Sequence, residues 1–252
     1  MWKTNGEYVR DILPKMPKRH STHTSHPLNK RRVTCFAPGT NPTSPTLFIG
    51  FPTIFDEYSF MEGRTTASVT ASNQDWVWSM VPLDGERMLT VTGCAVYMWH
   101  RTETSWTQGE RIVTEGPSMQ MKRGRRRQRP FISGLTHIGS DAAHFGMTTF
   151  TREVVMVDIE SKKRLATWRE HAGKVWNIER IDEHRFATGG DDHSIKIWDI
   201  RERSSVQTIE GLPGEVTALL SFDDTRLIAG ACPPDPVKSG RGAQLQFFDI
   251  RK

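Results

Sequence analysis

Three histidines near the N-terminus are spaced as metal ligands could be: His20, His23 and His26 lie three residues apart. Imidazole is a common ligand of zinc, and a structural zinc site takes four ligands in a closed tetrahedron. The surrounding residues 14–32 are polar and contain no cysteine. We therefore expect no metal site here, and no other motif in the chain indicates a cofactor.

A second group, His171, Thr188 and Asp192, contains an imidazole, a hydroxyl and a carboxylate. These are the chemical groups of a hydrolase triad. The same groups can also form a buried chain of hydrogen bonds that only stabilises a fold. Gly189-Gly190 lies beside them, but a strand and a turn surround it and no helix follows, so it is not a phosphate-binding loop.

The lysines and arginines are concentrated in two segments. Residues 1–33 hold eight of them against two acidic residues, and residues 122–129 (KRGRRRQR) hold six and no acid. The rest of the chain has 20 basic and 27 acidic residues. This distribution indicates local contact with an acidic partner rather than general adhesion. Residues 122–129 also have the composition of a nuclear-localisation signal.

Composition favours a globular protein of the cytosol or nucleus. The 252 residues are 36% hydrophobic and 25% charged, which argues against a disordered chain. Cys35, Cys94 and Cys232 are too few for a disulfide framework. No apolar run is long enough for a membrane helix, and the N-terminus lacks a signal-peptide core.

The chain repeats itself. Residues 174–201 align with residues 76–101 so that Val175-Trp176 matches Val77-Trp78, and Trp198 matches Trp99. Residues 215–251, 131–168 and 33–70 give further copies. Each copy has short runs rich in Val, Ile, Thr, Trp and Phe between Asp/Gly turns, which indicate strands and hairpins. Four strands per repeat of about 40 residues predict an all-β fold, a β-propeller of four-stranded antiparallel blades.

The segment GGDDHSIKIWDI at residues 189–200 resembles the signature of WD-repeat propellers, and residues 170–173 resemble the Gly-His region that opens a blade. The resemblance implies that four side chains tie this blade together: His171, Thr188, Asp192 and Trp198. It makes that group structural rather than catalytic. The resemblance is strong in residues 170–211, good in 76–113 and 215–250, and weaker elsewhere. Blade two has Trp99 without the acid, and blade five has Pro213-Gly214 in place of the histidine.

We expect five blades, at residues 33–72, 74–115, 130–169, 170–211 and 212–252. Residues 1–13 are expected to supply a partial blade, in which residues 7–13 complete the last blade as the family usually closes its ring. Family members usually have seven blades. The chain therefore forms either an unusually small ring or an incomplete seven-bladed ring, and we favour the second because MWKTNGE begins in mid-blade.

A four-stranded meander has two rims. We call the rim with the first–second and third–fourth turns the bottom rim, and the other the top rim. Residues 14–32 and the insertions 116–130 and 232–242 should all lie at the top rim, which predicts a basic top face for an acidic or phosphorylated peptide. Solvated insertions without a ligand are the alternative. The basic residues are Lys30, Arg31, Arg32, Lys122, Arg123, Arg125, Arg126, Arg127 and Arg129.

Residues 186–201 (FATGGDDHSIKIWDIR) also resemble the box by which substrate receptors of a cullin–RING ubiquitin ligase dock on their adaptor. The matching positions put Asp199 and Arg201 at the bottom rim, and Asp249 and Arg251 repeat the pair one blade later. A planar guanidinium can bind a carboxylate or carbonyl groups there. Trp-Asp-x-Arg is also frequent in ordinary WD repeats, where the arginine has only a structural partner. The repeats further resemble the F-box branch of the family; no F-box precedes them in this sequence, and a truncated chain could have lost one.

The sequence therefore predicts a non-catalytic scaffold for protein–protein interaction, in the cytoplasm or nucleus, with no membrane and no small-molecule substrate. Recognition of substrates for a ubiquitin ligase is the sharper version. The alternative is a nucleic-acid or ribonucleoprotein-associated factor that binds through residues 15–32 and 122–129. Neither basic segment contains an aromatic residue, which argues against base stacking within them.

Overall fold

The structure is a computed structural model, which describes residues 33–71, 76–112, 131–139, 143–233 and 243–251. Within these ranges the regular secondary structure is entirely β-strand, arranged as five antiparallel sheets with the strands in sequence order. The all-β propeller expected from the repeats is confirmed. No helix in the described ranges is long and apolar enough to cross a membrane.

Each sheet is one blade. Blade 1 consists of β1 (Cys35–Pro38), β2 (Thr46–Gly50), β3 (Ile54–Ser59) and β4 (Arg64–Thr70). Blade 2 consists of β5 (Val77–Pro82), β6 (Arg87–Thr92), β7 (Ala95–Arg101) and β8 (Trp106–Ile112). Blade 3 consists of β9 (Ile132–Ile138), β10 (His144–Thr149), β11 (Val154–Asp158) and β12 (Arg164–Trp168).

Blade 4 consists of β13 (Val175–Arg180), β14 (Arg185–Gly190), β15 (Ile195–Asp199) and β16 (Ser205–Ile209). Blade 5 has three strands in the described part of the chain: β17 (Glu215–Ser221), β18 (Arg226–Cys232) and β19 (Gln244–Asp249). Residues 7–13, which we expect to add its fourth strand, lie outside the described residues.

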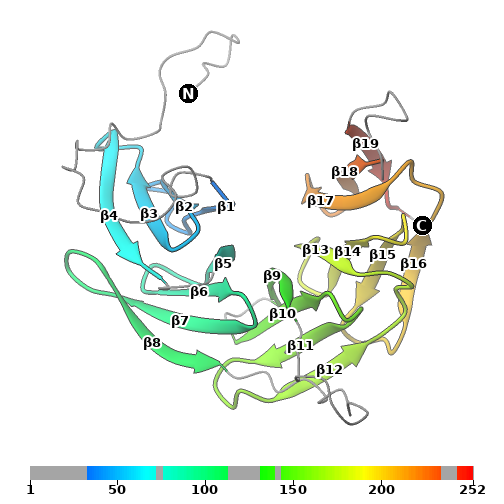
Figure 1. Cartoon of the computed structure of the whole chain (residues 1–252), viewed down its shortest axis with the longest axis horizontal. Coiled ribbons are helices and arrows are strands. Elements are labelled where there is room, and N and C mark those ends of the chain that lie inside the picture. The colour runs from blue at the N-terminus through cyan, green and yellow to red at the C-terminus, as the bar shows by residue number, and fades with distance from the viewer. Residues whose placement is uncertain (1–32, 72–75, 113–130, 140–142, 234–242, 252) are drawn as a thin grey trace, which may run out of the picture.

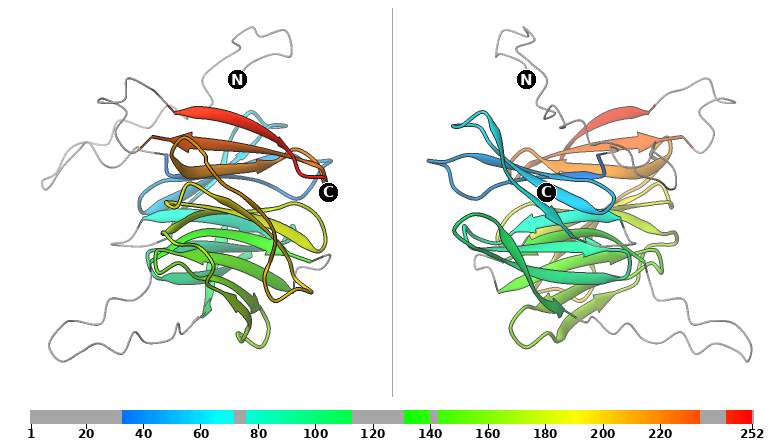
Figure 2. Two further views of the ribbon diagram at one scale, coloured as in Figure 1. Left: turned by 90° about the vertical axis from the view of Figure 1, so that its right-hand side faces the viewer. Right: turned by 60° about the vertical axis from the view of Figure 1, so that its left-hand side comes forward.

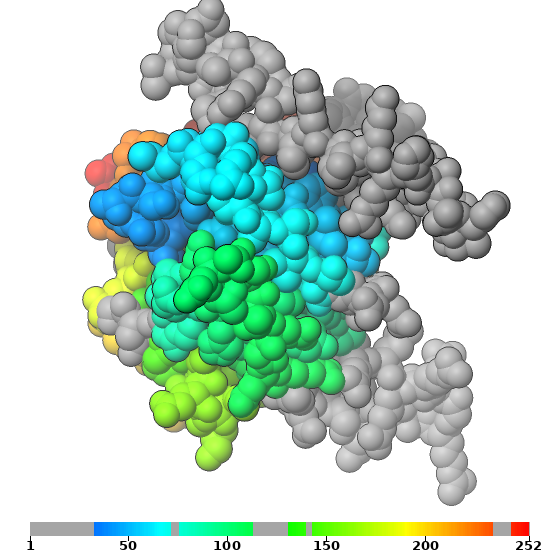
Figure 3. Space-filling view, turned by 90° about the vertical axis from the view of Figure 1, so that its left-hand side faces the viewer, coloured from blue at the N-terminus to red at the C-terminus, as the bar shows by residue number. Residues whose placement is uncertain are grey.

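The blades stand side by side in an arc, with the first strand of each blade toward the inside (Figure 1). Neighbouring first strands contact one another in the order β1, β5, β9, β13 and β17. The arc of described residues is open between blade 1 and blade 5 (Figure 1). Seen from the side, the blades form successive layers (Figure 2), and blades 1 and 2 make one continuous outer surface (Figure 3).

The apolar core is divided into layers between blades. One cluster joins blades 1 and 2 around Phe55 and Trp99, and the next joins blades 2 and 3 around Phe145. Blades 3 and 4 meet around Phe186, and blades 4 and 5 meet around Val216. The second strands β6, β10 and β14 are buried along nearly their whole length because a neighbouring blade covers each face.

The first strands of blades 2 to 5 share a β-bulge. In each, one residue of the first strand has no partner in the second strand, because the residues on either side of it pair with two consecutive residues there. A bulge leaves its extra residue unpaired and changes the direction of the side chain. The skipped residues are Trp78, Ser133, Trp176 and Thr217.

Blade 5 presents an apolar face to solvent. Pairing places Leu220 opposite Ile228, and Ile228 opposite Phe247, so these three side chains share one face of the sheet. Leu245 lies on the same face two residues before Phe247. The exposed fractions are 55% for Leu220, 71% for Leu245 and 76% for Phe247. The corresponding faces between the other blades are covered by a neighbour.

Candidate partner-binding rim

The bottom rim carries the same Asp–Arg arrangement in three of its first–second turns. In the turn between β13 and β14, the Asp182 carboxylate accepts hydrogen bonds from the backbone N–H groups of His184 and Arg185, both at 2.8 Å. The Arg185 side chain returns to the same carboxylate, with Nε 2.6 Å from Oδ2. Aspartate caps such turns because its short side chain can accept from the backbone two residues ahead.

The equivalent turns of blades 2 and 5 repeat this geometry. Asp84 accepts from the backbone N–H of Arg87 at 2.7 Å and from its Nε at 2.8 Å. Asp223 accepts from the backbone N–H of Thr225 at 2.9 Å and from Nε of Arg226 at 2.7 Å. Three arginines are thus held at fixed positions on one rim.

A second kind of pair ends the third strands of blades 4 and 5. Asp199 closes β15, and its carboxylate accepts from Nε of Arg201 at 2.8 Å and from the second guanidinium nitrogen at 2.6 Å. The backbone N–H of Arg201 donates to the same carboxylate at 3.0 Å. Asp249 and Arg251 repeat these contacts at the end of β19, with the backbone N–H at 3.0 Å and Nε at 2.9 Å.

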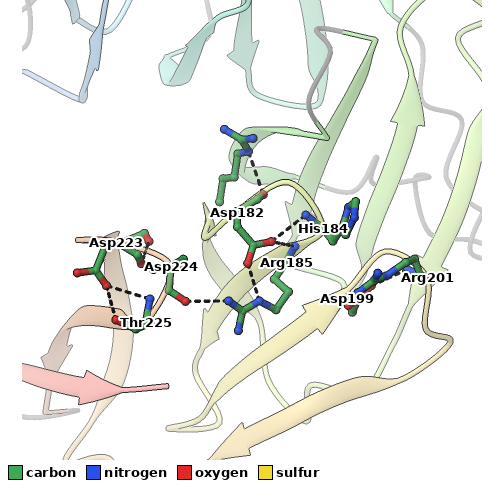
Figure 4. Close-up of polar contacts among 10 residues, drawn as sticks. Asp182, His184, Arg185, Asp199, Arg201, Asp223, Asp224 and Thr225 are labelled. Atoms are coloured by element: carbon green, nitrogen blue, oxygen red, sulfur yellow. Dashed lines mark hydrogen bonds and ion pairs between the residues drawn. The ribbon is translucent and has the colours of Figure 1, made fainter. Parts of the chain in front are cut away.

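Figure 4 shows the rim across blades 4 and 5, with both kinds of pair in one view. Arg185 spans the boundary between the blades, because its guanidinium also donates to the backbone oxygen of Asp224 at 2.7 Å. Beside it, the Glu179 carboxylate accepts from the backbone N–H of Ser221 at 3.1 Å. The two blades therefore share one continuous polar rim.

Charge pairing keeps the rim ionised. The hydrogen bond from Arg201 lowers the pKa of Asp199 to about 2, and the hydrogen bond from Arg251 lowers the pKa of Asp249 to about 2. Burial alone would raise the pKa of Asp182, but the N–H of His184 and the Arg185 side chain hold it below its ordinary value. The side chains of Arg201 and Arg251 stay accessible, with 65% and 71% exposed.

The predicted tetrad residues lie together inside blade 4. Nδ1 of His171 is 2.8 Å from the Asp192 carboxylate, and its Nε2 is 2.8 Å from the Thr188 hydroxyl. The same hydroxyl accepts a hydrogen bond from the Trp198 indole at 2.8 Å. His171, Thr188 and Trp198 are buried, so this imidazole and hydroxyl are out of reach of a substrate. Blade 2 keeps part of the chain, since the Trp99 indole donates to Thr90 at 2.9 Å.

The predicted basic top face cannot be placed in the same way. Residues 1–32 and 113–130, which include all nine of its basic residues, lie outside the described residues. The three histidines of the N-terminal segment lie outside them as well. In the ranges that the structure describes, no three His, Cys, Asp or Glu side chains gather as metal ligands would.

Two features were missed by sequence reasoning. The Asp-x-x-Arg turns are visible in the sequence as LDGER, IDEHR and FDDTR, one in each of three repeats. Comparison of the repeats position by position would have found them. Aromatic side chains at the top rim were missed too, although Trp78 and Trp176 occupy the same position in two aligned repeats.

The bladed arc and the tetrad define a β-propeller of the WD-repeat type. No family model matches the chain. A WD repeat-containing protein 55 homolog from Aedes aegypti is 26% identical over 82 residues, which are 32% of this chain and 18% of that protein. Eukaryotic translation initiation factor 3 subunit I from Nematostella vectensis is 25% identical over 108 residues, which are 42% of this chain and 32% of that protein.

A solved structure of U3-55K superimposes with a TM-score of 0.63 at 17% identity, covering 82% of this chain and 60% of the other. That likeness concerns the fold alone. The matches span less than a third of the length of both curated relatives.

Proposed function

We propose that the chain is a non-catalytic scaffold of the cytoplasm or nucleus that binds a protein partner at its bottom rim through Arg201 and Arg251. The observation that carries this proposal is the repeated Asp–Arg pair at the ends of β15 and β19. Each guanidinium is held on one side by its aspartate and remains largely exposed. A preorganised arginine loses little side-chain freedom when it binds, so more of its contact energy is available for affinity.

The partner should offer backbone carbonyl or carboxylate oxygens to this rim, because a guanidinium donates only to acceptors. The likeness of residues 186–201 to the docking box of ubiquitin-ligase receptors makes the adaptor of a cullin–RING ligase the partner to test first. In that role, the opposite rim would hold the substrate, an acidic or phosphorylated peptide.

Arg201→Ala tests the docking role, and Arg203→Ala is the matched control because Arg203 is an exposed arginine two residues away. Binding of the purified chain to the purified adaptor is measured by biolayer interferometry. Removing an interfacial arginine of a charge-paired site costs about 2 kcal/mol or more, so we expect R201A to weaken binding at least tenfold. R203A should bind as the wild type does. If neither variant changes the affinity, or the wild type does not bind, the ligase role is wrong.

A second candidate function is association with a ribonucleoprotein. It is supported by the likeness to a subunit of a translation initiation factor and by the six basic residues in 122–129. Replacing those six residues by glutamine should leave several phosphates without a cation. The slope of log affinity against log salt for an RNA oligonucleotide should then become shallower by about 0.7 for each phosphate that is no longer neutralised. An unchanged slope would show that this segment does not bind RNA.

A further inference from the structure

Five aromatic side chains form a continuous row along blades 2, 3 and 4. Trp76 stacks on Trp78 with ring centroids 5.4 Å apart, and Trp78 meets Phe131 edge-on at 5.1 Å. Phe131 stacks on Phe150 at 4.6 Å, and Phe150 meets Trp176 edge-on at 4.7 Å. We call these five residues the aromatic row. All five residues are half-buried.

The row lies at the top rim, opposite the arginines described above. Trp76 and Trp78 are at the start of β5, Phe131 directly precedes β9, and Phe150 follows the end of β10. Trp176 is the second residue of β13. Two of the five, Trp78 and Trp176, are bulge residues, which frees their indoles from the regular alternation of the strand. The row therefore crosses three blades at one level.

Positive charge accompanies the row. The exposed Lys174 ammonium lies 5.3 Å from the Phe150 ring centroid and 5.9 Å from that of Trp176. Arg152 is exposed and adopts a left-handed conformation, with φ of 68°, in the turn after Phe150. Its guanidinium reaches the backbone oxygen of Ala172, 3.5 Å away, in the connection that carries Lys174.

Two acids near the row make contacts of their own. The Asp191 carboxylate accepts a hydrogen bond from the Trp176 indole, and the buried Glu153 carboxylate pairs with Arg169. The top rim therefore offers aromatic faces and cations together.

We infer that the aromatic row binds single-stranded nucleic acid, with bases stacked on its rings and phosphates neutralised by Lys174 and Arg152. Every base has a π-face, so stacking tolerates any sequence, and cations along the path bind the backbone. A duplex keeps its bases paired inside and cannot stack on the row in this way. The inference rests on the second candidate function and supplies the aromatic groups that the basic segments lack.

The test uses the full 252-residue chain and a labelled single-stranded RNA of about twelve uridines, with fluorescence anisotropy at about 0.15 M salt. Phe150→Leu removes a π-face and keeps apolar volume. Phe222→Leu is its control, because Phe222 is 65% exposed, lies under Arg226 and belongs to the bottom rim. Lys174→Gln, with the exposed Lys163→Gln as control, tests the charge without touching the core. Unchanged melting temperatures show that the variants fold.

We expect F150L to raise the dissociation constant about tenfold and K174Q to raise it about threefold, with both controls unchanged. Duplex RNA should bind more weakly than the single strand, and binding should quench tryptophan fluorescence, since three of the row's residues are tryptophans. If F150L and K174Q bind as the wild type does while neutralising residues 122–129 abolishes binding, the row is not the site and the ribonucleoprotein function stands. If the wild-type chain binds no RNA, both the inference and the ribonucleoprotein function are wrong.

Discussion

Carboxylates that accept several hydrogen bonds organise both ends of blade 4. At the bottom rim, Asp182 and Asp199 each hold an arginine in place. At the top, Asp192 accepts from the backbone N–H of Ala172 and from the Ser194 hydroxyl, both at 2.8 Å, beside the imidazole of His171. Asp182 and Asp199 act within their own turns, whereas Asp192 joins the turn after β14 to the segment before β13, so its ionisation is coupled to folding.

The pKa of Asp192 gives a prediction for acid stability. Burial alone would raise this pKa, but the hydrogen bonds from His171, Ser194 and Ala172 hold it well below its usual value. Because the pKa of Asp192 is lower in the folded state than in the unfolded state, the ionised carboxylate stabilises the folded protein at any pH above the unfolded-state pKa. This stabilisation is lost as the pH falls from the unfolded-state pKa toward the folded-state pKa. We expect the melting temperature of the wild type to fall between about pH 4 and pH 2, and less steeply in Asp192→Asn.

The control for that measurement is Asp224→Asn, an exposed residue in the turn after β17. Calorimetry across the acid range should give this variant the same slope as the wild type. If Asp192→Asn also keeps the wild-type slope, the tetrad carboxylate does not contribute to acid stability.

At the scale of elements, neighbouring blades approach closely where a small residue faces a large one. Gly189 in β14 lies against Val216 in β17, so that a Cβ added at Gly189 would be only 2.4 Å from a Val216 methyl carbon and 2.8 Å from its Cβ. A Cβ added at Gly146 in β10 would lie 2.5 Å from Ile138 of its own blade and 2.8 Å from Ile178 in β13. These close approaches set the spacing between blades 3, 4 and 5.

Gly189→Ala should therefore lower the free energy of unfolding by about 1–3 kcal/mol, because the added methyl group overpacks the layer between blades 4 and 5. Gly85→Ala is the control, since no atom lies within 4 Å of its added Cβ. We expect this control to change stability by less than about 1 kcal/mol. Urea unfolding of both variants measures the difference. Equal midpoints would mean that blade 5 shifts freely against blade 4.

A buried carboxylate joins blades 1 and 2. Glu57 in β3 is only 1% exposed, and it accepts hydrogen bonds from the Trp106 indole at 3.0 Å and from Arg101 at 2.7 Å. Arg101 also lies over the Trp106 ring. A buried carboxylate needs hydrogen-bond donors to replace the water that it loses, so blades 1 and 2 are joined by a specific polar contact as well as by apolar packing.

The strands could be predicted from sequence because each depends on local patterns: short runs of β-branched and aromatic residues between Asp/Gly turns. The tetrad residues could be named because the resemblance assigns them to positions in one repeat. Contacts between repeats could not be predicted. Glu57 and Trp106 are far apart in the chain, and Gly189 meets Val216 only once the blades are stacked. The aromatic row is also assembled from three repeats.

At the scale of the whole molecule, blade 5 ends the described arc with an apolar sheet face that no further blade covers. Leu220, Leu245 and Phe247 form this face on blade 5. Exposed apolar patches of this kind drive association, because the removal of apolar surface from water lowers the free energy. We expect the purified chain to associate as its concentration rises, and the double variant Leu245→Ser, Phe247→Ser to remain monomeric over the same range.

Sedimentation velocity at several concentrations measures this association. Phe222→Ser is the control, because Phe222 is an exposed aromatic residue at the bottom rim rather than on the sheet face. It should associate as the wild type does. A wild-type chain that stays monomeric at every concentration would contradict the expectation.

At the β-bulges of the first strands, the residue type can change without a change in the pairing of the sheet. Trp78, Ser133, Trp176 and Thr217 occupy the bulge in four successive blades, and pairing passes over each of them. A substitution at such a position does not disturb the ladder of hydrogen bonds on which the blade depends. Ligand recognition at the top rim can therefore diversify one repeat at a time during evolution, while the scaffold that carries it is inherited unchanged.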